Sequence, residues 1–233
     1  PKIQNVSEFN DISDFSLKGS LEYYILNNLN LKFGLENKFI KSTYRQTWDD
    51  GLVDITETRN HFNSYLSAIW RPVQDLELES GLRFDSFTGK KDFHNYSPRF
   101  SAKYRINSIS SVKFATGIYY QYLNRIPRAF FNAIWTSADD YYDESRSIHY
   151  ILGYQRELPG AVSLETDVYY KEYNNIHQFN QNFLADVTPT GHSSTGKPLF
   201  NSTRDLFSTG NGESYGVEFM LKKETGIIDG WIA

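Results

Sequence analysis

One segment of the sequence concentrates arginines and aromatic side chains, the groups best suited to recognising an anionic or ring-containing ligand. Between Tyr122 and Ser147 these residues are Arg125, Arg128, Phe130, Phe131, Trp135, Tyr141 and Tyr142. Guanidinium groups pair with anions and stack on aromatic faces, and binding sites are lined by rings with a few polar groups. The residues expected to contact a small-molecule ligand are Arg125, Arg128, Trp135, Tyr141 and Tyr142. The alternative is that these rings pack the segment onto the rim of the fold or belong to an aromatic girdle.

Other residues with chemical potential do not assemble into a catalytic pattern. The segment Gly191–Pro198, GHSSTGKP, approaches a phosphate-binding loop, but Pro198 stands where Ser or Thr would bind magnesium. The five histidines lack metal-ligand spacing, and without cysteine there is no thiol catalysis. We therefore predict no catalytic residue, no metal ligand and no cofactor, and expect that the protein is not an enzyme.

A group of acidic residues leaves two interpretations open. Asp139, Asp140, Asp143 and Glu144 lie close together in the sequence. Oxygen-rich clusters can hold calcium, but no EF-hand pattern is present. The other interpretation is an acidic loop in contact with water.

Composition points to a surface that meets both water and an apolar medium. Aromatic residues make up 16% of the 233 residues, with 17 Tyr and 17 Phe, whereas hydrophobic residues make up only 39%. Tyr and Trp favour such boundaries because one end of each side chain is apolar and the other polar. A net charge of −4 gives no basic footprint for nucleic acid.

Period-two alternation is the main structural signal. From Asp14 to Leu26, apolar residues alternate with polar ones, and the pattern restarts at Leu29 after Asn27-Asn28. Two alternating runs joined by two turn-forming residues predict a β-hairpin. Further strands are expected at 76–86, 99–106, 112–120, 148–158, 162–170 and 215–221, with a last one starting near Trp231. The stretch 62–70 is also assigned to a strand, although its alternation is poor.

Strand length and loop asymmetry favour a membrane barrel over a soluble sandwich. A strand of about 11 residues, tilted by about 45°, covers about 25 Å, the height of an outer-membrane apolar band. Short turns alternate with long connections, expected at 44–57, 88–97, 122–147 and 174–212. This is the periplasmic and extracellular asymmetry of outer-membrane barrels. Near the short turns, Tyr23, Trp70, Tyr104 and Tyr154 are expected to form an aromatic girdle.

Several motifs resemble the barrel of TonB-dependent receptors, particularly the type common in Bacteroidetes-like bacteria. These are Asp75 to Asp85, DLELESGLRFD; Tyr96 to Gln121, with Pro-Arg-Phe near its start and GIYYQ at its end; Glu144 to Ile176; and Gly212 to Ile232, with SYGVE and a Gly-Trp strand start. The resemblance implies a barrel of about 22 strands around an N-terminal plug domain. It also implies contact with TonB and the inner-membrane energising complex through N-terminal parts not visible in this sequence.

The fold class expected is therefore all-β, an antiparallel transmembrane β-barrel segment with about ten strands of a larger barrel. Residues 1–233 are interpreted as one partial barrel domain, without the plug domain and the remaining strands. The expected function is active uptake of a scarce nutrient, such as a siderophore, cobalamin, oligosaccharide or peptide, across the outer membrane of a Gram-negative cell. Partners would be outer-membrane lipid, TonB and the nutrient. Alternatives are a passive porin, a ten-stranded outer-membrane hydrolase using Glu144 and His149, and a soluble carbohydrate-binding β domain.

Overall fold

Long antiparallel strands form one continuous curved wall. The computed structural model describes residues 6–48, 51–127, 133–180, 189–200, 203–204, 206–226 and 228–233. The strands are β1 (Ser7–Leu26), β2 (Leu29–Trp48), β3 (Gly51–Val73), β4 (Leu76–Thr88), β5 (Phe93–Asn107), β6 (Ser110–Gln121), β7 (Leu123–Ile126), β8 (Ile134–Ser137), β9 (Ser145–Leu158), β10 (Val162–Phe179), β11 (Gly191–His192), β12 (Pro198–Phe200), β13 (Phe207–Lys223) and β14 (Gly230–Ile232). Among these residues, no helix is long and apolar enough to span a membrane.

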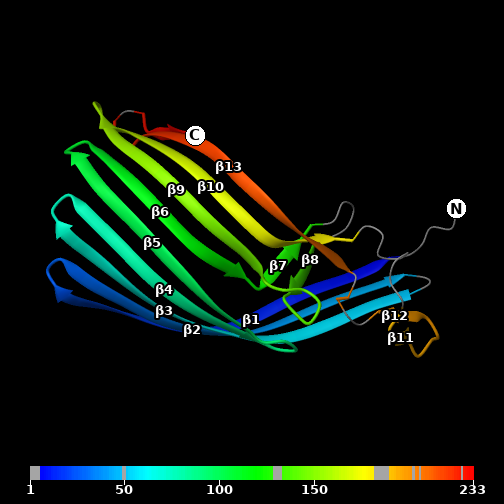
Figure 1. The fold of residues 1–233 in the computed structure, drawn as a ribbon. Helices are drawn as coiled ribbons and strands as arrows, with labels where there is room; N and C mark the ends of the chain where they lie inside the picture. Colours follow the sequence, from blue (N-terminus) through cyan, green and yellow to red (C-terminus); the bar gives the residue numbers. More distant parts are fainter. Residues whose placement is uncertain are drawn as a thin grey trace.

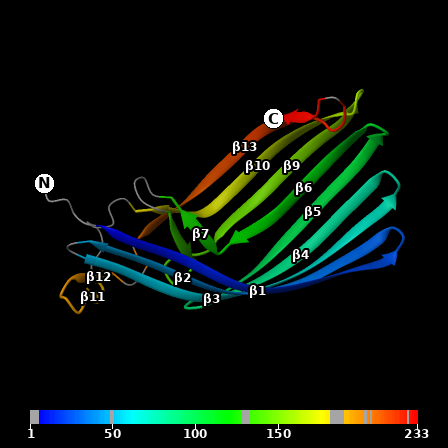
Figure 2. The same ribbon diagram turned by 180° about the vertical axis from the view of Figure 1, so that it is seen from behind.

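The sheet is an open trough with two different ends. Its strand order is β1-β2-β3-β4-β5-β6-β9-β10-β13-β14, with every neighbouring pair antiparallel. Short turns gather at one end and the long connections at the other (Figures 1 and 2). Within the described residues, β1 pairs only with β2, and β14 only with β13. The fold is thus the antiparallel arc expected from the alternating sequence.

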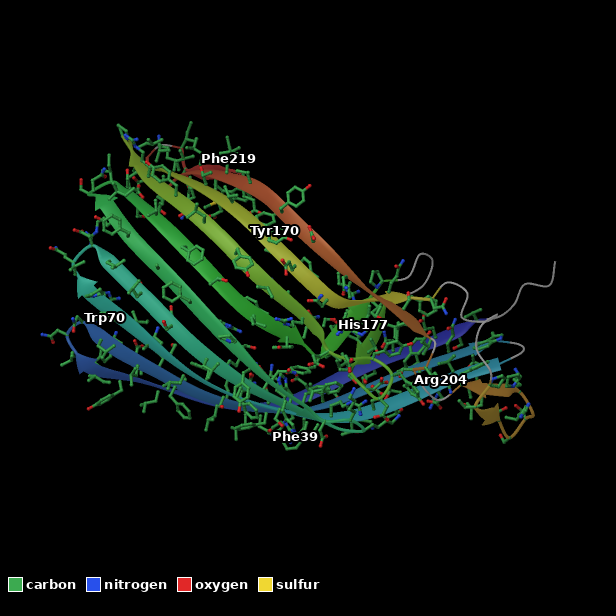
Figure 3. The ribbon with its side chains drawn as sticks, viewed as in Figure 1. Phe39, Trp70, Tyr170, His177, Arg204 and Phe219 are labelled. Atoms are coloured by element: carbon green, nitrogen blue, oxygen red, sulfur yellow. The ribbon has the colours of Figure 1, made fainter. Side chains whose placement is uncertain are left out.

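Register places opposite chemistries on the two faces of the wall. One cross-strand row reads Phe100, Thr116, Tyr150, Tyr170 and Tyr215, and the adjacent row reads Arg99, Gly117, His149, Lys171 and Ser214. The first row lies on the convex face with the exposed Phe39 and Phe219 (Figure 3), and the second lies on the concave face. Since successive residues of a strand point to opposite sides, the alternation extends across the whole sheet.

The aromatic residues near the short turns lie as the girdle requires. Tyr23, Trp70 and Tyr104 are exposed on the convex face, whereas Tyr154 is half-buried and its hydroxyl lies 3.4 Å from the Ser110 Oγ. Trp70 ends the stretch 62–70, and the strand predicted there is confirmed as part of β3. Its alternation is poor because Tyr65 and Ile69 face the trough, while Phe62, Leu66 and Trp70 face outward.

The expected loop at 44–57 is wrong, because β2 and β3 continue through it as a long hairpin. Here the phase of the apolar residues inverts. Tyr44, Val53 and Ile55 are buried on the concave side, whereas Lys41 and Arg45 face outward. The hairpin has left the apolar band, so its outer face meets water and its inner face packs on other loops. Loss of the outward-facing apolar pattern made this stretch resemble a loop.

The other long connections are also shorter than expected. Strand β5 begins at Phe93, within the expected loop 88–97. Within 122–147 the chain forms β7 and β8, and within 174–212 it continues β10, adds β11 and β12, and begins β13. GHSSTGKP is the β11–β12 hairpin, with Gly196 at φ 79° in its turn. Leu199 of this hairpin pairs with Leu52 of β3. The glycines of the motif are therefore explained by a hairpin turn, and phosphate binding is not needed to account for them.

The buried core lies at the loop end rather than in the middle of the trough. One cluster gathers Tyr44, Val53, Ile55, Ile126, Ile134, Tyr142, Phe200, Leu206 and Phe207. A second gathers Ile40, Phe87, Phe93, Tyr122 and Ala138. Both join the loop-end parts of the sheet to β7, β8 and the segments around them. The hydrophobic effect therefore holds the loop end together, while the convex face keeps its apolar side chains outside.

A charge placed on the convex face should destabilise the protein only when it meets lipid. In the whole protein folded into lipid vesicles, we expect Val217→Arg to lower the free energy of unfolding by about 2–4 kcal/mol, because an arginine near the bilayer midplane is poorly solvated. The matched change Glu218→Arg, at the adjacent concave-face position, should cost much less. Denaturant titration measures both, and equal costs would contradict the assignment of faces.

Candidate ligand site at the loop end

The β7–β8 hairpin spans the trough between its two sides. It contacts β1 and β2 on one side and β10 on the other. The Asn10 Nδ2 donates to the Ala133 carbonyl at 2.6 Å, and the Asn124 Nδ2 lies 3.3 Å from the His177 Nδ1. Figures 1 and 2 show the hairpin between β1 and β10, and Figure 3 places His177 where β10 passes it. The loop end is therefore partly covered by a strap built from its own chain.

Alternation inside the hairpin decides which side chains it buries. Ile126 and Ile134 are buried cross-strand partners within the first core cluster. Arg125 and Trp135 are the neighbouring pair, with Arg125 exposed and Trp135 half-buried. An arginine directly opposite a tryptophan offers an anion partner and a ring face at one place. The hairpin thus brings together two of the residues predicted to contact a ligand.

The remaining predicted contact residues differ in their surroundings. Tyr141 is 52% exposed and free to meet a ligand, whereas Tyr142 is buried. The hydroxyl of Tyr142 donates to the Phe207 carbonyl at 2.9 Å and accepts from the Phe207 N–H at 3.0 Å. Tyr142 therefore fits the packing alternative, since it joins the segment to the start of β13. Arg128 lies outside the described residues, as do Phe130 and Phe131.

A buried polar network of Glu57, Arg59 and Ser137, which we name the latch, joins β8 to β3. The Ser137 Oγ donates to the Glu57 Oε2 at 2.6 Å and accepts from the Arg59 Nε at 3.0 Å. The Arg59 Nη2 lies 3.0 Å from the Glu57 Oε1, and both charged side chains are only 3% exposed. A buried pair adds little net stability over an apolar pair, but removing one partner leaves an uncompensated charge. Sequence reasoning missed this latch because 44–57 resembled a loop, so Glu57 and Arg59 were not placed on one strand face.

The acidic residues are divided among separate partners. Asp139, 1% exposed, accepts hydrogen bonds from the backbone N–H groups of Tyr141 and Tyr142 and from the Thr203 hydroxyl. The Asp143 carboxylate bonds to the Lys91 Nζ at 2.7 Å, which raises the pKa of Lys91. Across the described residues, no group of three possible metal-ligating side chains occurs. Asp139 thus has a structural role that neither interpretation of the acidic cluster anticipated.

The residues of the hydrolase alternative do not meet. The Glu144 Oε1 accepts a hydrogen bond from the Asn95 Nδ2 at 2.7 Å. His149 lies five residues further along the chain, about 16 Å at the rise of an extended strand, and packs 4.5 Å from the Tyr119 ring centroid. A general acid–base pair has to converge on one reacting group within hydrogen-bond reach. These two residues lack that arrangement.

Solved structures of similar fold include siderophore receptors and an iron transporter. The siderophore receptor PirA from Pseudomonas aeruginosa matches with a TM-score of 0.62 and 15% identity over 94% of this chain. The FrpB iron transporter from Neisseria meningitidis (F3-3 variant) matches with a TM-score of 0.64 and 14% identity over 93% of it. The alcaligin outer-membrane receptor FauA from Bordetella pertussis gives 0.57 and 14% over 96%.

This likeness establishes the fold: the chain is an antiparallel transmembrane β-barrel segment. It spans 41% of the PirA chain, 34% of the FrpB chain and 38% of the FauA chain. No protein-family model matches the sequence. No curated protein matches it either.

The latch predicts unequal effects of single and double substitutions. Arg59→Met leaves Glu57 buried without its cation, so the hairpin should detach from β3 at a cost of about 3–5 kcal/mol. Hydrogen exchange of the β7 and β8 amides should then become faster. The double variant Glu57→Met with Arg59→Met restores an apolar contact of similar volume and should recover most of the protection. Equal exchange in all three proteins would show that the latch does not hold the hairpin.

Proposed function

We propose that this chain is part of the barrel wall of an outer-membrane receptor that imports a scarce small-molecule nutrient, with an iron–siderophore complex as the leading class. In this proposal TonB and the inner-membrane energising complex drive transport through a plug domain elsewhere in the protein. Residues 1–233 then form a partial barrel domain, and the Bacteroidetes-like type stays a prediction from the sequence motifs.

The observation that carries the proposal is the combination of an apolar convex face with a polar concave wall spanned by the β7–β8 strap. Apolar side chains such as Leu17, Phe33 and Val217 are exposed outward, as contact with lipid requires. The concave face carries charged pairs such as Lys113 with Glu165. A soluble binding module has no reason to expose a continuous apolar band, because such a patch would aggregate in water. The resemblance in fold to siderophore receptors and an iron transporter supports the choice of nutrient.

A passive porin shares the two-faced wall, so energy dependence has to separate the two functions. In cells that carry the whole protein, uptake of iron-labelled siderophore should stop when a protonophore removes the membrane potential, while binding to the cells persists. Deleting the gene should abolish both. Uptake that survives the protonophore, together with steady ion conductance in planar bilayers, would identify a porin and overturn the proposal.

The cross-strand pair Arg125 and Trp135 on the strap should contribute to ligand capture. We expect Trp135→Ala and Arg125→Gln each to weaken binding of the imported complex by about tenfold, because each removes a ring or a guanidinium from the contact. The control is Lys91→Gln, which removes a cation at the same end that is already paired with Asp143. Equilibrium binding to the purified receptor measures the effect. Unchanged affinity in both strap variants would favour the packing role for these side chains.

A further inference from the structure

The concave wall carries a row of basic residues whose positions are set by strand register. Arg99 on β5 pairs with Gly117 on β6, which pairs with His149 on β9, which pairs with Lys171 on β10. We name Arg99, His149 and Lys171 the basic row. The row continues on either side through Gly81 on β4 and Ser214 on β13. Strands that are far apart in the chain therefore present three nitrogen-bearing side chains at one level.

The basic row rests on tyrosine rings instead of carboxylates. The Arg99 Cζ lies 4.6 Å from the Tyr119 ring centroid, and the imidazole of His149 lies 4.5 Å from the same ring. The Lys171 Nζ lies 4.8 Å from the Tyr169 ring centroid. Within the described part of the chain, none of the three basic side chains has a carboxylate at ion-pair distance. A ring face attracts a cation without neutralising it, so the charges of Arg99 and Lys171 stay available to an anion.

A hollow of about 440 Å³ adjoins the Arg99 end of the row. Its lining includes Lys32, Tyr65, Glu79, Arg83, Arg99 and Tyr119. Small residues, Ser67 and Gly81, are cross-strand partners in its floor. Small residues on neighbouring strands remove side-chain bulk at one place, so the wall is indented there.

Glycine also fixes the tyrosine beside the hollow. A Cβ built on Gly34 would lie 2.3 Å from the Tyr65 Cε1, so the ring can lie flat only because position 34 has no side chain. At Gly117 a Cβ would lie 3.1 Å from both the Arg99 Cγ and the Tyr119 hydroxyl. Glycines in strand interiors often mark a close approach of another group. Here Gly34 and Gly117 allow the rings of Tyr65 and Tyr119 to lie against the wall, one on each side of Arg99.

Charge around the hollow favours an anion. Lys32 is 3.9 Å from Glu22, and Arg83 is bonded to Asp85, so these two cations are partly neutralised, whereas Arg99 is not. On β10 the nearest concave-face carboxylate to Lys171 is that of Asp167, four residues away, or about 13 Å along the strand. Glu79 is the one carboxylate among the lining residues of the hollow. The level of the basic row is thus net positive, with aromatic faces on either side.

We propose that the hollow and the basic row bind the anionic, aromatic part of a small molecule as it enters the trough. The inference rests on the proposed function and makes it narrower: the receptor takes a net-anionic ligand with aromatic rings. Arg99 pairs with an anionic oxygen, the Tyr65 ring packs against the ligand's rings, and His149 and Lys171 extend the contact along the wall. The competing occupant is an acidic segment of the same protein.

Two iron complexes of different charge test the inference on the purified whole receptor. The anionic, aromatic probe is the ferric complex of 2,3-dihydroxybenzoate, and the neutral, non-aromatic probe is ferric acetohydroxamate. Calorimetry should show at least tenfold tighter binding of the anionic probe. Arg99→Gln and Lys171→Gln should each weaken that binding by about tenfold, the effect of removing one charged hydrogen-bond donor. Binding of the neutral probe should change by less than about twofold.

Two further variants separate charge, shape and folding. Gly81→Val keeps every charge and fills the hollow, because its Cβ would already lie 3.2 Å from that of Ser67. It should weaken binding of the anionic probe as Arg99→Gln does. Lys103→Gln removes a cation on the same face of β5, four residues closer to the short turns, and should change nothing.

Each other outcome has a defined meaning. Unchanged affinity in Arg99→Gln and Gly81→Val, or binding of neither probe, overturns the inference. A lower unfolding midpoint in Arg99→Gln with unchanged probe affinity would assign the row to an acidic protein segment and also overturn it. If the receptor prefers the neutral probe while energised iron uptake persists in cells, the proposed function stands and this inference fails. Only the absence of energy-dependent iron uptake in cells that carry the wild-type protein would overturn the proposed function itself.

Discussion

The constraint behind the whole structure is that each long strand of the main sheet separates two solvents. Lipid offers no hydrogen bonds, so every backbone N–H and C=O within the apolar band has to pair with a neighbouring strand. Side chains then sort by face: Leu82 and Val217 point outward, whereas their neighbours Arg83 and Glu218 point into the trough. The core found in soluble proteins is consequently absent from the middle of the trough in the described residues, where the concave wall carries ion pairs and stacked cations.

Above the band the rule reverses, and apolar residues at the loop end face inward. Once β2 and β3 leave the lipid, water meets their outer face and apolar residues such as Tyr44 and Val53 turn inward. These side chains give the β7–β8 strap an apolar surface to pack on, and the Glu57–Arg59–Ser137 latch fixes its position. A strap held in this way can present Arg125 and Trp135 over the trough. The position of the strap therefore depends on the change in solvent along one hairpin.

Below the strap, the concave wall carries the basic row. Register alone aligns Arg99, His149 and Lys171, and Gly34 and Gly117 leave room for the Tyr65 and Tyr119 rings. Such a wall is preorganised, because its side chains are held by neighbouring strands before a ligand arrives. Strap and wall together give a path lined by cations and aromatic faces, consistent with the import of an anionic molecule proposed above.

The sequence by itself determined the strands inside the apolar band, their facing and the short turns. Alternation such as that of Leu29, Leu31 and Phe33 repeats every two residues, and a one-residue slip would turn each side chain to the wrong solvent. The sequence also marked the segment rich in arginine and aromatic residues. Only the tertiary structure decided that 44–57 is a hairpin, that Tyr142 is buried while Tyr141 is exposed, and that β5, β6, β9 and β10 align a basic row. These features depend on contacts between residues distant in the chain, which local periodicity does not encode.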